Sequence, residues 1–541
     1  MSIVESIKNI VKKHFKMHAL VSMVFALVML VGYIIYINFS YYWDFLHSDI
    51  ATDLAFIREA ARQMSLFPTG WSQINEMRLI YITTPAILFY LITGNVHLAY
   101  SLATSFMFIV NIALFYYMIS VEKRNIFATI GGIFVFLAFF SRNSMFSIFS
   151  ILFINGSLST HLATIFLTIG VYLRVKFNTE EESKGFKFLK ILTILLAFTQ
   201  GIQSPRMIVA IYAPLLFVEL LPLLSNVDKE EFKINEKGVL YALIAFSFNG
   251  LGMVFVNYLV SHGVIAVAQI GRTTVLNIAH SSFFIDRTFS TANGVFEALG
   301  LFGNSEIFGT DGLVFVIRLA FLFVVLLLYK KIKKDALDKN LVNLLFATVV
   351  FNFFAQALTF MGMGERFNFT LTSLIAVIFV LTFHHVVENL SHYQPQKYII
   401  TGMVALLLSG AFLSLGDMRM ERNPSLINYR LSVIDFLKEE GLTVGYGYFW
   451  QALSLAAFSD WEIQMISLNS GILGPPIPQG VSYDVFHHDE DRVFLLAPLH
   501  LIEDAYDYVW MRDLLLTGER HDFPWGWVIY IFDYNPWANM K

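Results

Sequence analysis

The stretch DFLHSDIATDLAFIREAARQMSLFPTGW, residues 44–71, decides how this chain is interpreted. It directly follows a long apolar segment and carries carboxylates at Asp44, Asp49, Asp53 and Glu59. Apolar residues recur beneath them at three- or four-residue steps, which predicts a helix with one apolar stripe lying along a membrane surface. The stripe comprises Ile50, Leu54, Ile57, Ala61, Met64 and Phe67.

The carboxylates of this helix allow an ordinary interpretation and a functional one. Asp49 falls at or near the helix start, where backbone N–H groups favour an anion. Asp53 lies one turn later on the same side. A capping aspartate on a solvated helix face explains the pattern, and so does an acidic site at a membrane surface.

The composition indicates that the bilayer is the solvent for most of the chain. Of its 541 residues 56% are hydrophobic and only 14% are charged, and the mean hydropathy is +0.62. A soluble protein of this length carries more charge. The chain has no cysteine, which excludes disulfides and thiolate metal sites. The first apolar run lacks a small-residue cleavage motif, so we expect a membrane helix there instead of a cleaved signal peptide.

Apolar segments of sufficient length predict about eleven membrane-spanning helices, each of about 20 residues. Lys-rich connections alternate with connections that nearly lack lysine. Because basic residues stay in the cytoplasm, we expect the N-terminus inside and, after an odd number of crossings, the C-terminal segment outside. The expected spans centre on residues 18–39, 97–120, 125–141, 159–176, 188–203, 205–223, 239–259, 313–329, 341–360, 369–386 and 398–415.

The apolar residues 80–120 can form either two spans separated by a GNV turn or one span preceded by a shorter helix. Two spans would place Lys123 and Arg124 outside, against the charge pattern. We therefore expect a half-inserted helix from about Thr84 to Thr93, followed by one true span.

Two domains are expected. Residues 1–416 form the transmembrane domain, whose outer loops span 40–96 and 260–312. Residues 417–541 form a small α/β domain outside the membrane. Apolar runs and helical spacing in this tail predict strands at TVGYGYFW, EIQMISL, RVFLLAPL and WGWVIYIFDY, and helices at QALSLAAFS and HLIEDAYDYVWMRDLLL.

The order of features up to about residue 415 resembles the GT-C superfamily of membrane glycosyltransferases. An inner N-terminus and one span lead into the acidic helix, the Pro-containing short helix TTPAILFYLIT and a span that ends in basic residues. The resemblance implies a GT-C fold and a catalytic carboxylate in the first outer loop. That family often has paired acidic residues, Asp-Glu or Asp-x-Asp, whereas this chain has HSDIATD, so Asp49 and Asp53 both remain candidates.

The resemblance implies a sugar donor carried on polyprenyl phosphate. An inverting transfer needs one carboxylate to take the proton of the acceptor hydroxyl; we expect Asp49 to be this base and Asp53 to orient the acceptor or share a metal. Asp44 and Glu59 are further candidates. The leaving phosphate needs cationic groups at headgroup depth. Candidates for phosphate binding are Arg366 and Arg206, and candidates for other substrate contacts are His161, Gln203 and Glu365.

We expect no required cofactor, although Asp49 and Asp53 have the ligand type that suits Mg²⁺ or Mn²⁺. The expected partners are the polyprenyl-phosphate sugar, an outer glycan acceptor, the bilayer, a separate donor synthase and a flippase, but no nucleic acid. The composition and the resemblance together indicate a bacterial plasma membrane and undecaprenyl phosphate as the carrier.

Two other functions fit a protein of this class. A lipid or glycan transporter would have charges scattered through its spans and some repeat symmetry. This chain instead gathers its carboxylates and arginines at one membrane face, with Arg318 as the main exception. An oligosaccharide polymerase or ligase would place key arginines in a late outer loop and lack the acidic first loop. Glycosyl transfer is the function that the sequence favours.

Overall fold

The chain is seen here as a computed structural model, and its parts fall into two compact units that are described separately. Unit 1 contains residues 1–38, 104–254 and 274–420; unit 2 contains residues 39–103, 255–273 and 421–541. The structure describes residues 3–72, 77–139, 152–153, 156–178, 183–224, 235–265, 283–298, 312–313, 315–320, 323, 336–359, 368–389, 424–468, 472, 476–477, 490–524 and 526–538.

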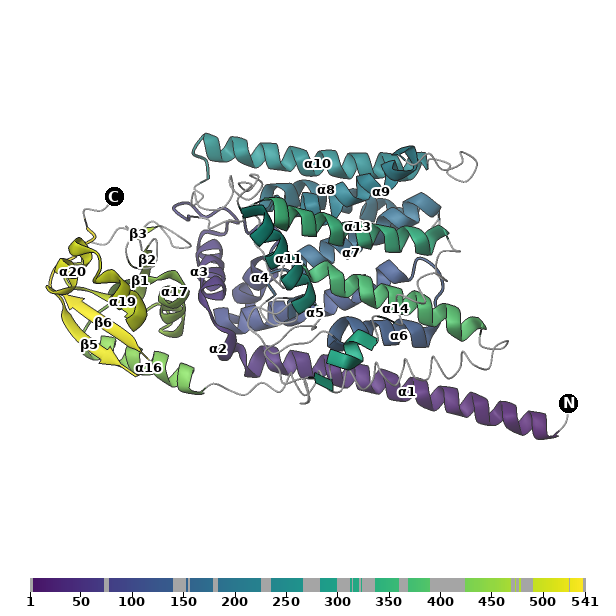
Figure 1. The fold of residues 1–541 in the computed structure, drawn as a ribbon, viewed down its shortest axis with the longest axis horizontal. Coiled ribbons are helices and arrows are strands. Elements are labelled where there is room, and N and C mark those ends of the chain that lie inside the picture. The colour runs from purple at the N-terminus through teal and green to yellow at the C-terminus, as the bar shows by residue number, and fades with distance from the viewer. Residues whose placement is uncertain are drawn as a thin grey trace. The chain divides into compact units, whose positions relative to one another are not determined.

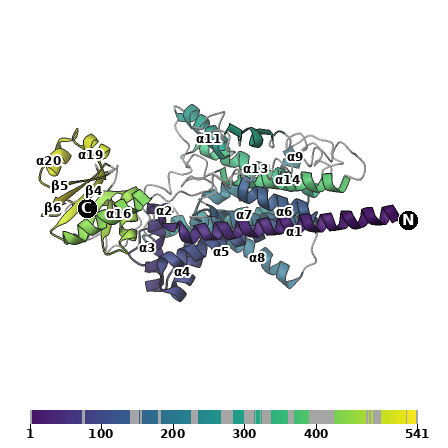
Figure 2. The ribbon, with the colours of Figure 1, turned by 90° about the horizontal axis from the view of Figure 1, so that it is seen from below.

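Unit 1 is helical, and its long helices run side by side (Figures 1 and 2). The shorter helix α11 packs against α13 and runs at a steep angle to it (Figure 1). A short π-helical segment, Val135–Phe139, continues α6, and another, Ile208–Tyr212, directly precedes α9. The helices that lie wholly or mostly in this unit are α1 (Ile3–Ser40), α5 (Val96–Ile119), α6 (Ile126–Phe134), α7 (Ser159–Phe177), α8 (Lys184–Gln203), α9 (Ala213–Leu224), α10 (Glu236–Ser261), α11 (Phe284–Ala298), α13 (Ala336–Leu358) and α14 (Phe369–Asn389).

The prediction of a helical membrane protein is confirmed. Among the described residues, five helices are long and apolar enough to cross a membrane: Leu20–Ser40 within α1, and α5, α8, α10 and α13. Of the remaining expected spans, 313–329 is described only in part and 398–415 lies outside the described residues. The number of crossings and their orientation stay predictions.

Helices α8 and α10 approach each other closely because two glycines face each other. A Cβ atom added to Gly252 would lie 2.1 Å from the carbonyl oxygen of Phe198, and one added to Gly201 would lie 2.1 Å from that of Asn249. The Asn249 side chain donates a hydrogen bond to the Ala197 carbonyl at 2.9 Å, which joins the two helices at this point. Small residues allow such contacts between helices in a membrane, where water does not drive association.

Replacing Gly252 by alanine is therefore expected to destabilise unit 1 by roughly 1–3 kcal/mol, the usual cost of overpacking. Gly250 on the same helix is the matched control, because a Cβ atom there meets nothing within 4 Å. Gly250→Ala is expected to be neutral or to stabilise by up to about 1 kcal/mol, through helix propensity. Thermal unfolding of the purified protein measures both, and equal midpoints for the two variants would contradict the close contact.

The short helix expected before the second span is present in unit 2. Helix α4 covers Thr83–Thr93 and ends at Gly94, whose φ of 67° is the left-handed conformation that glycine adopts without steric cost. Helix α5 begins two residues later at Val96 and is long enough to span a membrane. One short and one long helix, rather than two spans, thus follow the acidic segment.

The C-terminal part of unit 2 contains a six-stranded sheet in the order β3-β2-β1-β4-β6-β5. The central strand β1 pairs in parallel with β2 and β4, whereas β3, β5 and β6 join antiparallel. The strands are β1 (Val444–Tyr448), β2 (Gln464–Leu468), β3 (Pro476–Ile477), β4 (Val493–Pro498), β5 (Glu519–Phe523) and β6 (Trp527–Phe532).

Both faces of this sheet are covered by helices, as the strand β4 illustrates. Successive side chains of a strand point to opposite faces. Val493 and Leu495 pack with α19 (Leu499–Ala505) and α20 (Val509–Leu515), whereas Phe494 and Leu496 pack with α16 (Pro424–Glu439) and α17 (Phe449–Phe458). The predicted mixed α/β tail is confirmed, together with its four predicted strands.

Three details of the tail differ from the prediction, and one is the two-residue strand β3, which was not predicted. The single helix expected over residues 500–516 is divided into α19 and α20, because Tyr508 is extended, and this break lets both helices reach the sheet. The edge strand β5 was not predicted, because its residues ERHDF are polar and mostly exposed. An edge strand packs little apolar surface and so leaves little hydrophobic pattern.

The predicted amphipathic helix is α3 (Ser48–Gln63), but protein covers much of its apolar face. Ile50, Leu54 and Ile57 are at most 2% exposed, and α3 packs against α4 and α17. Figure 1 shows α17 between the sheet and α3. Only the end of the expected stripe, Met64 and Phe67, is exposed. The expectation that this face lies on the membrane surface is therefore wrong for the first three turns of the helix.

Candidate active site

The acidic segment, residues 44–63, contains α2 (Tyr42–Phe45) in part and α3, and its geometry is set by the start of α3. His47 is the N-cap residue in an extended conformation, and its Nδ1 accepts a hydrogen bond from the Asp49 backbone N–H at 3.2 Å. Asp49 lies in the first helical turn, as predicted, and its side chain is 42% exposed. The free N–H groups of that turn favour its negative charge. Asp49 is thus an accessible carboxylate in a fixed place.

Asp53, one turn later, is buried in an ion pair. Its residue is 2% exposed, and Nε of Arg78 lies 2.5 Å from its Oδ1. The Tyr100 hydroxyl donates a second hydrogen bond to Oδ2 at 3.3 Å. Burial raises the pKa of Asp53 to about 6, and the attraction of Arg78 opposes that rise. The carboxylate is ionised at neutral pH and holds α3 to residues 77–82.

Arg78 was not among the residues that the sequence singled out. It is 8% exposed, and Asp53 raises its pKa although burial acts in the opposite direction. Its guanidinium also lies 5.9 Å from the ring centre of Phe56 and 5.8 Å from that of Tyr81. One signal in the sequence would have found it: an arginine directly before the apolar run 79–93 needs a partner for its charge.

The pH dependence of stability follows from the pKa of Asp53. Folding raises this pKa from 3.8 to about 6, so the folded state binds a proton that the unfolded state has released between those values. Stability from this group is therefore complete below about pH 4 and is lost as the pH rises to about 6. We expect the unfolding midpoint of wild type to fall across this window relative to Asp53→Asn. Parallel pH profiles of the two proteins would contradict this assignment.

The other two carboxylates of the acidic segment have local partners. Glu59 accepts hydrogen bonds from both Arg62, at 2.5 and 2.9 Å, and Gln63; these bonds hold its pKa below the usual value. Asp44 lies in the first turn of α2, and its negative charge attracts the guanidinium of Arg430. Burial lowers the pKa of Arg430 to about 10, and the charge of Asp44 opposes that shift. Arg430 in turn donates to the Leu46 carbonyl at 3.0 Å. Both carboxylates have structural partners.

The C-terminal part of unit 2 packs against one side of the acidic segment. The Ser48 hydroxyl donates to the Phe449 carbonyl, and Arg58 lies 3.4 Å from the Asp460 carboxylate. The rings of Trp43 and Phe458 lie 5.2 Å apart, and those of His97 and Trp461 lie 6.0 Å apart. The α/β tail is therefore part of the same folded unit as Asp49.

The remaining described candidates lie in unit 1, at the start of α7 and the end of α8. His161 and Gln203 are buried there, and Arg206, half-buried, follows α8. A hydrogen bond of 3.2 Å from Gln200 to Thr164 joins the two helices at this end. The structure brings His161 and Gln203 to the same end of one helix pair. Glu365 and Arg366 lie outside the described residues.

A divalent metal shared by Asp49 and Asp53 does not fit this geometry. Both carboxylate oxygens of Asp53 have donors, Arg78 and Tyr100, and a cation there would lie beside the Arg78 charge. Within the described parts of the chain, no three His, Asp or Glu side chains gather as a metal site.

Comparison with solved structures identifies the fold. The structure of ArnT from Cupriavidus metallidurans bound to undecaprenyl phosphate superposes with a TM-score of 0.53 and 12% identity, over 95% of this chain and 99% of that one. The oligosaccharyltransferase of Archaeoglobus fulgidus, tethered to an acceptor peptide, gives a TM-score of 0.42 and 10% identity. That match covers 89% of this chain and 69% of the other. No protein family and no curated protein matches the sequence. This chain has a GT-C-like fold.

Proposed function

We propose that this chain is a membrane glycosyltransferase that moves one sugar from a polyprenyl phosphate to an acceptor hydroxyl outside the cytoplasm. The observation that carries the proposal is the fold shared with ArnT, a protein whose structure holds undecaprenyl phosphate, over nearly the whole of both chains. The acceptor is a cell-surface polysaccharide, a teichoic acid or a lipid-linked glycan. The setting is a bacterial plasma membrane with the C-terminal part outside, and a separate synthase and flippase supply the donor.

Asp49 is the proposed general base. Its exposed carboxylate takes the proton of the acceptor hydroxyl as that oxygen attacks the anomeric carbon. The new carbon–oxygen bond forms on the face opposite the leaving group, so the configuration inverts. The bond between the anomeric carbon and the phosphate oxygen breaks, and the lipid phosphate leaves with that electron pair.

Asp53 acts as a positioning residue in this mechanism. It is buried and bound to Arg78 and Tyr100, so it is not accessible to an acceptor. Its ion pair instead fixes the first two turns of α3, and with them Asp49. The phosphate of the donor carries negative charge that grows as the lipid leaves, and Arg366 and Arg206 are the proposed cations for it.

The test uses the purified full chain in liposomes with a panel of labelled polyprenyl-phosphate sugars and extracted surface polymer. Two products are followed: label on the polymer and free polyprenyl phosphate. Their appearance in equal amounts supports the proposal. Movement of intact donor across the vesicle membrane without release of polyprenyl phosphate would instead establish a transporter. Sugar joined as preassembled oligosaccharide blocks would establish a polymerase or ligase.

A further inference from the structure

A groove between α8 and α10 in unit 1 lies at the opposite end of these helices from Gln203. It has a volume of about 680 Å³, within the range of small-molecule sites. The first turns of both helices form one end of it, together with the last turn of α7. This is the end marked by the Lys-rich connections, which the charge pattern assigns to the cytoplasmic face.

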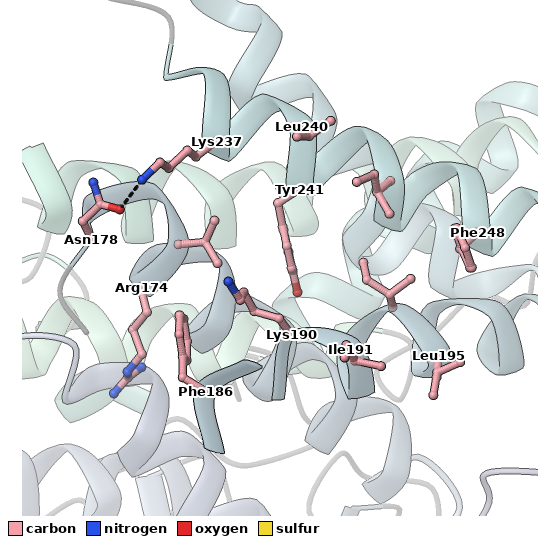
Figure 3. Close-up of a pocket in the computed structure, with 13 residues that line it drawn as sticks. Arg174, Asn178, Phe186, Lys190, Ile191, Leu195, Lys237, Leu240, Tyr241 and Phe248 are labelled. Atoms are coloured by element: carbon pink, nitrogen blue, oxygen red, sulfur yellow. Dashed lines mark hydrogen bonds between the residues drawn. The ribbon is translucent and has the colours of Figure 1, made fainter. Parts of the chain in front are cut away.

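Among the described residues that line the groove, the charged side chains are all basic and lie at one end. Lys190 comes from α8 and Lys237 from α10, on the two sides of the groove (Figure 3). Lys237 donates to the Asn178 side chain at 2.9 Å, and the Lys190 ammonium lies 5.4 Å from the ring centre of Phe186. Arg174 also lines this end, and no acidic side chain does among the lining residues that the structure describes. The groove therefore complements an anion.

The rest of the groove is apolar and runs along the helix axes. Leu240, Ile244 and Phe248 recur every four residues on one face of α10, and each is at least 36% exposed. Ile191 and Leu195 form the facing side on α8 and are more than half exposed. From Leu240 to Phe248 the strip extends roughly 12 Å at 1.5 Å per residue. The groove has a cationic head and an apolar body.

We propose that this groove binds one anionic phospholipid, with its phosphate between Lys190 and Lys237 and one acyl chain along the α8–α10 strip. Basic pockets between membrane helices on the cytoplasmic side suit anionic headgroups. The side chains around the groove favour a lipid over a soluble phosphate. A soluble phosphate would contact the lysines but leave the exposed isoleucine and leucine side chains uncovered, whereas a lipid contacts the lysines with its headgroup and the apolar side chains with its acyl chain. This site is separate from the acidic segment and does not depend on the proposed transfer reaction.

The test is native mass spectrometry of the delipidated full chain titrated with phosphatidylglycerol or phosphatidylcholine. We expect the first lipid bound to be phosphatidylglycerol. Each lysine contributes roughly fivefold to affinity, so Lys190→Gln with Lys237→Gln weakens it about 25-fold. The matched control is Lys184→Gln with Lys187→Gln, which removes the same charge from exposed positions on α8 outside the groove. The control is expected to bind as wild type does.

A third variant separates the two parts of the site. Ile244→Trp fills the apolar strip while both lysines remain, and it is expected to reduce phosphatidylglycerol binding by at least tenfold. Glycerol 3-phosphate serves as a headgroup without chains, and it is expected not to compete. Three outcomes would each overturn the proposal. They are equal binding of the two lipids, equal losses of binding in the groove and control lysine variants, and full competition by glycerol 3-phosphate.

Discussion

Replacing Asp49 by asparagine is expected to slow sugar transfer by about 10²–10⁴-fold, the usual contribution of a general base. Asparagine keeps the size and the hydrogen-bonding position of the side chain but cannot take a proton from the acceptor. Because the donor phosphate is bound by other groups in the proposed mechanism, binding of the polyprenyl-phosphate sugar is expected to stay unchanged. The measurement is the initial rate of transfer at saturating donor, with donor affinity determined separately.

Glu59→Gln on the same helix is the control for Asp49→Asn. Glu59 is half-buried and already bound by Arg62 and Gln63. Its replacement removes a carboxylate from the same helix, about 15 Å along the axis from Asp49, without removing the proposed base. We expect transfer within about threefold of wild type, because the ion pair with the exposed Arg62 side chain is a weak one. Full activity of Asp49→Asn would contradict the assignment and direct attention to Asp44. A reduced donor affinity would show that Asp49 acts in binding.

The parts of the fold that could be predicted from the sequence are those that a local pattern specifies. The start of α3 just before Asp49 and the end of the short helix α4 just before Gly94 follow from local preferences, for an acidic residue in the first turn and for glycine after the last. The short continuous apolar runs of β4 and β6 likewise predicted two buried strands. In each of these cases the residues that predict the element lie within the element or next to it in the sequence.

Contacts between distant segments could not be predicted in this way. Arg78 and Asp53 are 25 residues apart, and Ser48 and Phe449 are 401 apart. The sequence indicated an amphipathic helix but not what covers it, because an apolar stripe looks the same whether lipid or protein buries it. The expectation that the membrane covers the apolar stripe of α3 was wrong for its first three turns for this reason. The same limit explains why Asp53 was grouped with Asp49 as a reacting group instead of a buried partner.

Arg78→Met is expected to destabilise α3 and its surroundings by roughly 3–5 kcal/mol at pH 8, because it leaves the Asp53 charge buried without its partner. Arg78 and Asp53 are 8% and 2% exposed in their side chains, so water cannot replace the lost contact. The matched control is Arg62→Met, whose side chain is 66% exposed beside Glu59 and whose loss is expected to cost less than about 1 kcal/mol. Hydrogen exchange of the α3 amides measures both free energies of opening.

Two further results distinguish loss of charge pairing from loss of packing at Arg78. Without the arginine, the pKa of Asp53 rises further, so the carboxylate takes up a proton more readily and the destabilisation is expected to shrink at pH 5. Combining Arg78→Met with Asp53→Asn removes the buried charge altogether and is expected to recover most of the lost stability. If instead the Arg78→Met defect were the same at pH 5 and pH 8 and the second substitution added to it, packing of the arginine side chain against Phe56 and Tyr81 would be its main contribution. The ion pair would then not be what holds Asp49 in place.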